Sequence, residues 1–230
     1  MKFIILNVLC EGPTEERFVK KVLTPFLQKY NIFPKTVLLT TSRKKNAYGG
    51  MISYTQAKRD LELCMRKYTS NDSELHLFTT MFDYYALPND FPGYHEADKI
   101  QDVRIRINHL EQAFAADINH RCFIPYLQLH EFEAILFTDI EKLKVEYPKA
   151  EKEIIQLKES TELVSDPELI NNHPDTAPSK RIIRALKNKY NYDKVKSGSA
   201  TAAYIGIENI LNSCQHFREW INILLSSNNL

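Results

Sequence analysis

The stretch FIILNVLCEGPTEERF, residues 3–18, contains the pattern that decides the fold. Residues 3–9 are almost continuously apolar, with Asn7 as the exception, which is typical of a strand buried on both faces. Gly12 and Pro13 interrupt this run, and from Phe18 onward apolar side chains recur at the spacing of an amphipathic helix. The stretch therefore predicts a buried strand, a tight turn and a helix.

The same alternation continues along the chain. Further strands are predicted over residues 36–41, 75–82 and 122–129, with helices over 54–68 and 97–114 between them. This β-α-β-α-β-α-β order favours an α/β fold, a parallel sheet flanked by helices. From residue 131 onward only helical patterns remain, over 131–137, 148–159, 166–171, 179–190 and 204–225. We therefore expect an α/β domain over residues 1–140 and a C-terminal helical extension over 141–230 that packs on it.

Composition limits the class of protein. The 230 residues suit one domain, or one domain with a subdomain, and 43% hydrophobic with 26% charged residues is ordinary for a globular chain. Lys and Arg number 30 against 29 Asp and Glu, so contact with nucleic acid must come from a local patch. The four scattered cysteines form no Cys-x-x-Cys pair, and no apolar run approaches the roughly 20 residues of a membrane span. We expect a cytoplasmic protein with reduced thiols and no membrane contact.

Carboxylates follow three of the four predicted strands. Glu11 follows the first strand, Asp83 the third, and Glu131 the fourth, with Glu133 just beyond. Ligands of open α/β sheets bind at the carboxyl ends of the strands, and clustered carboxylates need a cation, for which Mg²⁺ or Mn²⁺ suits oxygen donors. Such an ion could polarise a phosphoryl oxygen and activate a water. Taken singly, each acid could instead be a helix-terminus or turn residue.

Several motifs resemble a known family. Residues 8–18, VLCEGPTEERF, are similar to the E-G-x-[T/S]-[D/E] signature of topoisomerase–primase (TOPRIM) domains, in the branch found in overcoming-lysogenization-defect (OLD) nucleases. The chain resembles, more narrowly, a bacterial domain-of-unknown-function family of small TOPRIM-like proteins. The further motifs that fit are residues 82–88, 90–93, 130–134, 178–181, Gly206 and 214–220. Members of that family are often encoded beside an ABC-type or SMC-like ATPase, in clusters that resemble anti-phage defence modules.

The resemblance implies a TOPRIM-like fold and Mg²⁺-dependent phosphodiester chemistry. It implies metal ligation by Glu11, Glu15 and Asp83, with Glu133 or Glu131 completing a second ion site. The sequence departs from the family pattern at the second position of the usual Asp-x-Asp pair, where Tyr85 stands. Asp90 could substitute from the loop. The departure leaves open one ion, two ions, or no catalysis at all.

Basic residues provide candidates for nucleic-acid contact. Lys180 and Arg181 open a predicted helix and could hold a phosphate, as a point charge and a bidentate fork respectively. Arg43, Lys44 and Lys45, beside Tyr48, could follow a nucleic-acid backbone, although a solvated loop is the commoner explanation of such a run. The lysines at positions 187, 189, 194 and 196 extend a basic region with the same ambiguity. Tyr84, Tyr85 and Tyr94 could line a substrate groove near Asp83, or could simply pack.

These patterns support a first hypothesis of a Mg²⁺-dependent nuclease that acts on DNA or RNA in a defence-type module. Its catalytic residues would be Glu11, Asp83, Glu131 and Lys180, with Glu11 as general acid or base and Lys180 at the phosphate. The alternative is a catalytically degenerate TOPRIM-like protein that binds and regulates a partner ATPase. A phosphohydrolase of small phosphate esters is a weaker third hypothesis. The choice between DNA and RNA, and the existence of a homodimer, remain open at this stage.

Overall fold

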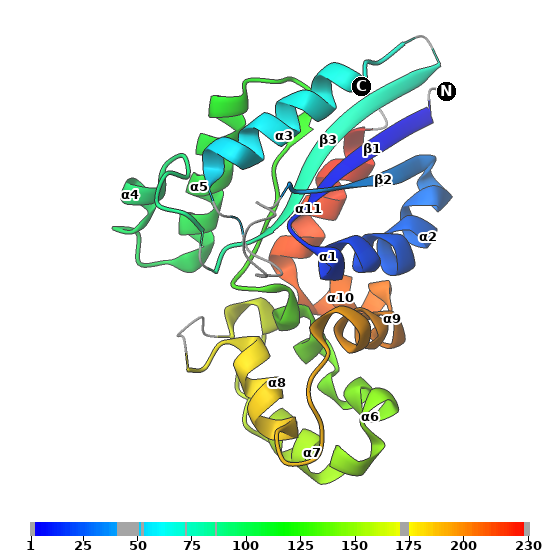
Figure 1. Ribbon diagram of the computed structural model, residues 1–230, viewed down its shortest axis with the longest axis vertical. Coiled ribbons are helices and arrows are strands. Elements are labelled where there is room, and N and C mark those ends of the chain that lie inside the picture. Colours follow the sequence, from blue (N-terminus) through cyan, green and yellow to red (C-terminus); the bar gives the residue numbers. More distant parts are fainter. Residues whose placement is uncertain are drawn as a thin grey trace.

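A parallel sheet forms the centre of the molecule. Figure 1 shows the computed structural model, which describes residues 3–40, 51, 53–71, 73–85, 87–170 and 175–227. Its five strands are β1 (Phe3–Cys10), β2 (Ile32–Leu38), β3 (Glu74–Asp83), β4 (Phe123–Ile124) and β5 (Leu127–Gln128). The strand order is β2-β1-β3-β4, β5 also pairs with β3, and every pair is parallel. The predicted α/β class with a parallel sheet is confirmed.

The register of the strands brings their carboxyl ends together. Cys10 at the end of β1 pairs with Met81 of β3, and Asp83 at the end of β3 pairs with Gln128 of β5. Glu11 continues the ladder, because its N–H donates to the carbonyl of Met81 at 3.2 Å. The residues that directly follow β1, β3 and β5 therefore lie along one edge of the sheet.

The predicted fourth strand is divided into β4 and β5 around Pro125 and Tyr126. Proline has no N–H to donate to a ladder. At the same point the backbone of Tyr126 bonds a side chain of β3 and not its backbone. The Thr80 hydroxyl accepts from Tyr126 N at 3.0 Å and donates to Tyr126 O at 2.9 Å. The strand therefore shifts relative to β3 without losing its buried hydrogen bonds.

Helices cover both faces of the sheet. Side chains alternate along β3, so Phe78 and Phe82 enter one hydrophobic cluster while Leu77 and Met81 enter another. The first cluster is covered by α3 (Tyr54–Lys67), α4 (Tyr94–Ala97) and α5 (Val103–Ile118). The second is covered by α1 (Pro13–Phe18), η1 (Val19–Leu23), α2 (Thr24–Leu27) and α11 (Gln215–Ser226). The short η2 (Gln28–Tyr30) follows α2 and buries no residue.

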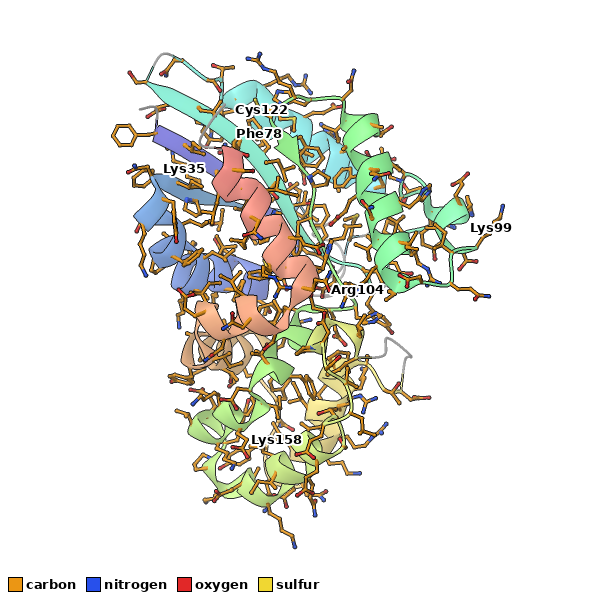
Figure 2. All side chains as sticks on the ribbon, turned by 180° about the vertical axis from the view of Figure 1, so that it is seen from behind. Lys35, Phe78, Lys99, Arg104, Cys122 and Lys158 are labelled. Atoms are coloured by element: carbon orange, nitrogen blue, oxygen red, sulfur yellow. The ribbon has the colours of Figure 1, made fainter. Side chains whose placement is uncertain are left out.

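Helix α11 is attached to the sheet by a buried tryptophan. Trp220 Nε1 donates to Thr79 Oγ1 of β3 at 3.0 Å, and its ring stacks on Tyr126 at a centroid distance of 4.2 Å. Figure 2, seen from behind, shows α11 running across this face of the strands. The last helix of the chain thus completes the core around the first strands.

The remaining helices extend beyond the carboxyl edge of the sheet, at the lower end of Figure 1. They are η3 (Phe132–Thr138), η4 (Ile140–Lys142), α6 (Leu143–Glu146), η5 (Pro148–Ala150), α7 (Glu151–Glu159), η6 (Pro167–Leu169), α8 (Pro178–Leu186), η7 (Lys194–Gly198), α9 (Ser199–Ile205) and α10 (Ile207–Ser213). One buried cluster includes Leu6 of β1 and Ile154 of α7, so apolar packing is continuous across residue 140. The boundary between domains at that position stays a prediction. None of the helices in the described ranges is both long enough and apolar enough to span a bilayer.

Four predicted helices differ from the structure. The helix predicted over 97–114 begins at Val103 as α5, and the one predicted over 166–171 is the short 3-10 segment η6. The pattern over 204–225 predicts one helix, but α9, α10 and α11 are separated at Gly206 and Cys214. Gly206 has a φ of +83°, a conformation that glycine adopts readily and other residues rarely do. The predicted helix over 131–137 is a 3-10 segment, η3, which begins at Phe132. Apolar spacing alone does not report these changes of direction.

Candidate active site

Glu11 links the ends of the two central strands. Its Oε2 accepts a hydrogen bond from Asp83 N at 2.9 Å, and its Oε1 accepts from Met51 N at 3.2 Å. Glu15 follows one helical turn later and is only 4% exposed. Gly12 leaves room for it, since a Cβ atom there would lie 3.2 Å from Glu15 Oε2. The first strand and helix thus place two carboxylates at one edge of the sheet.

Asp83 connects this edge to the segment after β5. Its Oδ1 accepts from Phe132 N at 2.9 Å, which holds the start of η3 beside the end of β3. Glu131, the preceding residue, is buried, and its Oε1 accepts from both the N–H and the hydroxyl of Ser179, at 3.2 and 3.0 Å. These bonds bring the beginning of α8 to the same edge.

A lysine from far along the chain lies among these acids. Lys194 Nζ is 3.0 Å from Glu133 Oε2 and 3.7 Å from Asp83 Oδ2. Glu133 is fully buried, and its other carboxylate oxygen accepts from the Tyr192 hydroxyl at 3.4 Å. The ammonium therefore provides the positive charge that this buried carboxylate requires.

The crowding of buried acids shifts their pKa values upward. Burial, together with the charge of Asp83, raises the pKa of Glu11 to about 7. Burial also raises the pKa of Glu15 to about 7, although Lys194 opposes the shift. The pKa values of Asp83 and Glu133 are raised as well, chiefly by burial. Burial alone would lower the pKa of Lys194, but Glu133, Asp83 and Glu15 raise it well above its usual range. Near neutral pH, the cluster is short of positive charge.

The donor chemistry of this cluster fits a hard divalent cation. Every candidate ligand is a carboxylate oxygen, the donor type that Mg²⁺ and Mn²⁺ prefer. Among the described residues, the ammonium of Lys194 is the one cation that contacts Glu133 Oε2, and this oxygen accepts no hydrogen bond from them. Within the described ranges, these acids do not bring three ligand atoms within 4.8 Å of one another. An ion would therefore have to compete with Lys194 and draw the carboxylates inward.

Comparison with known proteins assigns the family. A family model described as "Domain of unknown function (DUF4276)" matches residues 10–225, nearly the whole chain. The chain belongs to this family. Among solved structures it is similar to the C-terminal region of the Xanthomonas campestris pv. campestris OLD protein, at 16% identity and a TM-score of 0.29. That alignment covers 89% of this chain and 93% of the other. No curated protein matches.

The five residues predicted to contact nucleic acid, at positions 43, 44, 45, 180 and 181, have no ion pair with the acidic cluster among the described residues or lie outside the described part of the chain. Lys180 is exposed, on the first turn of α8. Arg181 is partly buried and donates from Nε to Thr176 O at 2.7 Å, so part of its guanidinium is already engaged. Arg43, Lys44 and Lys45 fall outside the described residues. Their proposed contact with nucleic acid stays a prediction.

Asp90 caps a helix and does not take the place of the second aspartate of the family pattern. Its carboxylate accepts from Tyr54 N at 3.0 Å and from Thr55 N at 3.4 Å, at the beginning of α3. It thus satisfies N–H groups that a helix start leaves unpaired. Tyr85, at the position of the second aspartate, donates its own N–H to His130 O at 2.6 Å. Neither residue adds a carboxylate to the cluster.

Lys194 is the site residue that sequence reasoning placed only in a general basic region. Its one local signal is the sequence Tyr192-Asp193-Lys194 before a small-residue segment, and this signal does not predict a contact with Asp83, 111 positions earlier (194 − 83). Only the packing of η7 beside α1 and η3 brings the ammonium to the carboxylates.

A second group of buried acids caps α11. Asp166, Glu168 and Cys214 each place a ligand-type atom within 4.8 Å of the others. Their oxygens are occupied: Glu168 Oε2 accepts from His216 N at 2.7 Å, and Asp166 Oδ2 pairs with Arg104 Nη2 at 2.5 Å. These acids neutralise the N-terminus of α11 and serve the fold.

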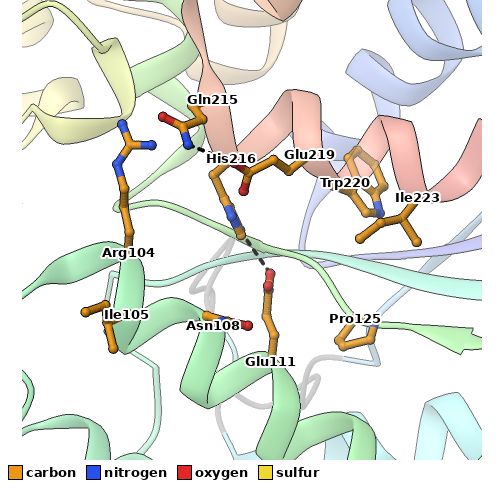
Figure 3. Close-up of a pocket in the computed structure, with 10 residues that line it drawn as sticks. All are labelled: Arg104, Ile105, Asn108, Glu111, Pro125, Gln215, His216, Glu219, Trp220 and Ile223. Atoms are coloured by element: carbon orange, nitrogen blue, oxygen red, sulfur yellow. Dashed lines mark hydrogen bonds and ion pairs between the residues drawn. The ribbon is translucent and has the colours of Figure 1, made fainter.

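Beside this group lies a cavity of about 330 Å³ between α5 and α11 (Figure 3). Within it, His216 Nε2 lies 3.0 Å from Glu111 Oε1, which also accepts from Leu127 N at 2.8 Å. Burial would lower the pKa of His216, but the hydrogen bond with Glu111 and the neighbouring glutamates raise it. This ion pair joins α5, β5 and α11, so we assign it to the fold and not to the acidic cluster.

Proposed function

We propose that this protein hydrolyses phosphodiester bonds of DNA or RNA in a reaction that depends on Mg²⁺ or Mn²⁺. The observation that carries the proposal is the convergence of Glu11, Glu15, Asp83 and Glu133 on one edge of a parallel sheet. Carboxylates at the carboxyl ends of parallel strands occupy the usual place of a ligand site in open α/β folds. The family resemblance of the motifs around Glu11 and Asp83 supports the same chemistry, in a defence-type module.

Glu11, Glu15, Asp83 and Glu133 would hold the metal. When bound, such an ion polarises a phosphoryl oxygen and lowers the pKa of water. Glu11, with its pKa near 7, is suited to accept or release a proton at neutral pH. Glu131 positions the start of α8 through Ser179. Lys194 contacts Asp83 and Glu133, whereas Lys180 is exposed and forms no ion pair with these acids within the described residues, which favours Lys194 as the phosphate-facing cation.

A second candidate function is a regulatory protein with a degenerate site, docked on an ATPase. The observation that favours it is the ion pair of Lys194 with Glu133, which already supplies a cation to the buried acids. Tyr85 in place of a second aspartate points the same way, because it removes one expected ligand. On this hypothesis the cluster stabilises the fold and the partner performs the chemistry.

Metal binding and cleavage distinguish the two functions. We would titrate Mg²⁺ and Mn²⁺ by calorimetry, and follow cleavage of labelled single-stranded DNA, duplex DNA and RNA, for the wild type and Glu11→Gln. Glu62→Gln is the matched control, since Glu62 lies on α3 with a side chain 45% exposed. The nuclease proposal expects binding and cleavage that are lost in Glu11→Gln and kept in Glu62→Gln. Equal cleavage by both variants, or no ion binding and no cleavage by the wild type, would refute it.

A further inference from the structure

A pocket lined by tyrosines opens directly beyond Asp83. It has a volume of about 180 Å³ and is lined by Tyr84, Tyr85, Leu87, Tyr94, Ala97, Asp98 and Leu110. Tyr84 and Tyr85 are the two residues that follow Asp83 in the chain. Phe82 and Asp83 alternate in direction at the end of β3, so the pocket lies on the α4–α5 side of the sheet while Asp83 faces Lys194.

The walls of this pocket are held in place by the surrounding structure. The Tyr84 hydroxyl accepts from Arg106 Nη1 at 3.0 Å, and the guanidinium of Arg106 is itself held by the carbonyl of Ile100. The backbone of Tyr85 is fixed by its hydrogen bond to His130 O. Tyr85 nevertheless keeps 36% of its surface exposed. An aromatic surface that is already ordered can stack on a ligand with little loss of conformational entropy.

The polar groups of the pocket disfavour a phosphate and favour a flat aromatic ligand that donates a hydrogen bond. Among the described residues that line it there is no lysine or arginine, whereas the exposed Asp98 provides a carboxylate. No ion pair or hydrogen bond to that carboxylate occurs among the described residues. An aromatic wall with one free acceptor suits a nucleobase that carries an exocyclic amine. Thymine and uracil flank their N–H with two carbonyl oxygens, which a carboxylate repels.

We propose that this pocket binds one unpaired nucleobase of a single-stranded nucleic acid, with a base that carries an exocyclic amine (adenine, cytosine or guanine) preferred over thymine or uracil. The inference rests on the proposed function, since the base would belong to the strand whose phosphate lies at Asp83. A base within a duplex is stacked and paired, so its faces are not available to Tyr85 and Tyr94. The pocket therefore makes the substrate a single strand, or an unpaired position in a duplex.

Binding without cleavage tests the pocket. We would measure the fluorescence anisotropy of labelled oligo-dC, oligo-dT, oligo-rC and a duplex of equal length with the full chain, using Ca²⁺ in place of Mg²⁺. We expect tighter binding of oligo-dC than of the duplex or oligo-dT. The double variant Tyr85→Ala/Tyr94→Ala should weaken oligo-dC binding about 5- to 100-fold, from the known worth of base–aromatic stacking. Comparison of oligo-dC with oligo-rC shows whether the protein prefers DNA or RNA.

Control variants separate stacking from damage to the fold. Tyr85→Phe keeps the ring and should bind as the wild type does, and Tyr204→Ala removes a tyrosine that is 46% exposed on α9, outside the pocket. Asp98→Asn should reduce the preference for oligo-dC over oligo-dT. Equal affinity of the double variant and the wild type, or duplex binding as tight as oligo-dC, would overturn the proposal. If the protein cleaves in Mg²⁺ but the tyrosine substitutions leave binding unchanged, the pocket proposal alone is rejected. If binding depends on the base but no cleavage occurs, the nuclease function alone is rejected.

Discussion

Replacement of Lys194 by methionine gives the sharpest test of the electrostatics of the acidic cluster. Methionine keeps most of the length of the side chain and removes the charge. The ammonium lies 3.0 Å from a carboxylate oxygen of Glu133, whose residue has no exposed surface, and 3.7 Å from Asp83. Without Lys194, these two buried carboxylates lose the cation that they contact.

The expected loss of stability depends on how far each partner of the Lys194–Glu133 ion pair is buried. Removing one partner of a fully buried ion pair destabilises a protein by about 3–5 kcal/mol. The Lys194 side chain is 40% exposed, so solvent screens part of the interaction and we expect about 2–3 kcal/mol at pH 8. The pKa of Glu133 is already raised, so protonation replaces the ammonium as the pH falls. The loss should therefore be smaller at pH 5 than at pH 8.

Urea denaturation followed by circular dichroism, in EDTA at pH 8 and pH 5, measures this difference. Lys196→Met is the matched control, because Lys196 is an exposed residue two positions further along. Added Mg²⁺ should restore more stability to Lys194→Met than to the wild type, since the ion no longer competes with the ammonium. An equal loss of stability at both pH values, or no loss at pH 8, would refute the reasoning.

Three more perturbations test the rest of the structure by the same denaturation assay. Glu11, Glu15 and Glu168 have pKa values of about 7 in the fold against 4.5 in the unfolded chain. The folded state therefore binds more protons between these values, and the free energy of unfolding in EDTA should fall from pH 5 to pH 8 by on the order of 2–3 kcal/mol for each of the three groups; a rise would contradict the burial of these acids. Asp90→Ala removes the acceptor at the start of α3 and should destabilise by about 1 kcal/mol, whereas Asp90→Asn should restore most of the loss. Trp220→Phe should destabilise by about 1–3 kcal/mol through loss of the buried bond to Thr79, and an unchanged urea midpoint would show that the bond contributes nothing.

Much of the fold follows from local patterns. The apolar runs that became β1 and β3 are long and continuous, so burial on both faces of a parallel sheet was their only compact arrangement. The short β4 and β5 were predicted as one strand. Between them the Thr80 side chain, and not the backbone of β3, bonds the backbone of Tyr126, and the apolar pattern does not indicate this change. The single helix predicted over 204–225 failed for a related reason: helical spacing continues through Gly206, while the direction of the chain does not.

The candidate site was predictable in part for the same physical reason. Parallel strands end at one edge, so Glu11, Asp83 and Glu131 could be placed together from strand ends alone. What only the tertiary structure decided is the partner of these acids: Lys194 reaches them, Asp90 caps α3 instead, and Lys180 stays exposed. The position and the apolar character of each strand are carried by residues that are neighbours in the chain. Contact between a lysine and a carboxylate more than a hundred residues apart depends on how the helices pack around the sheet, and local sequence carries no record of it.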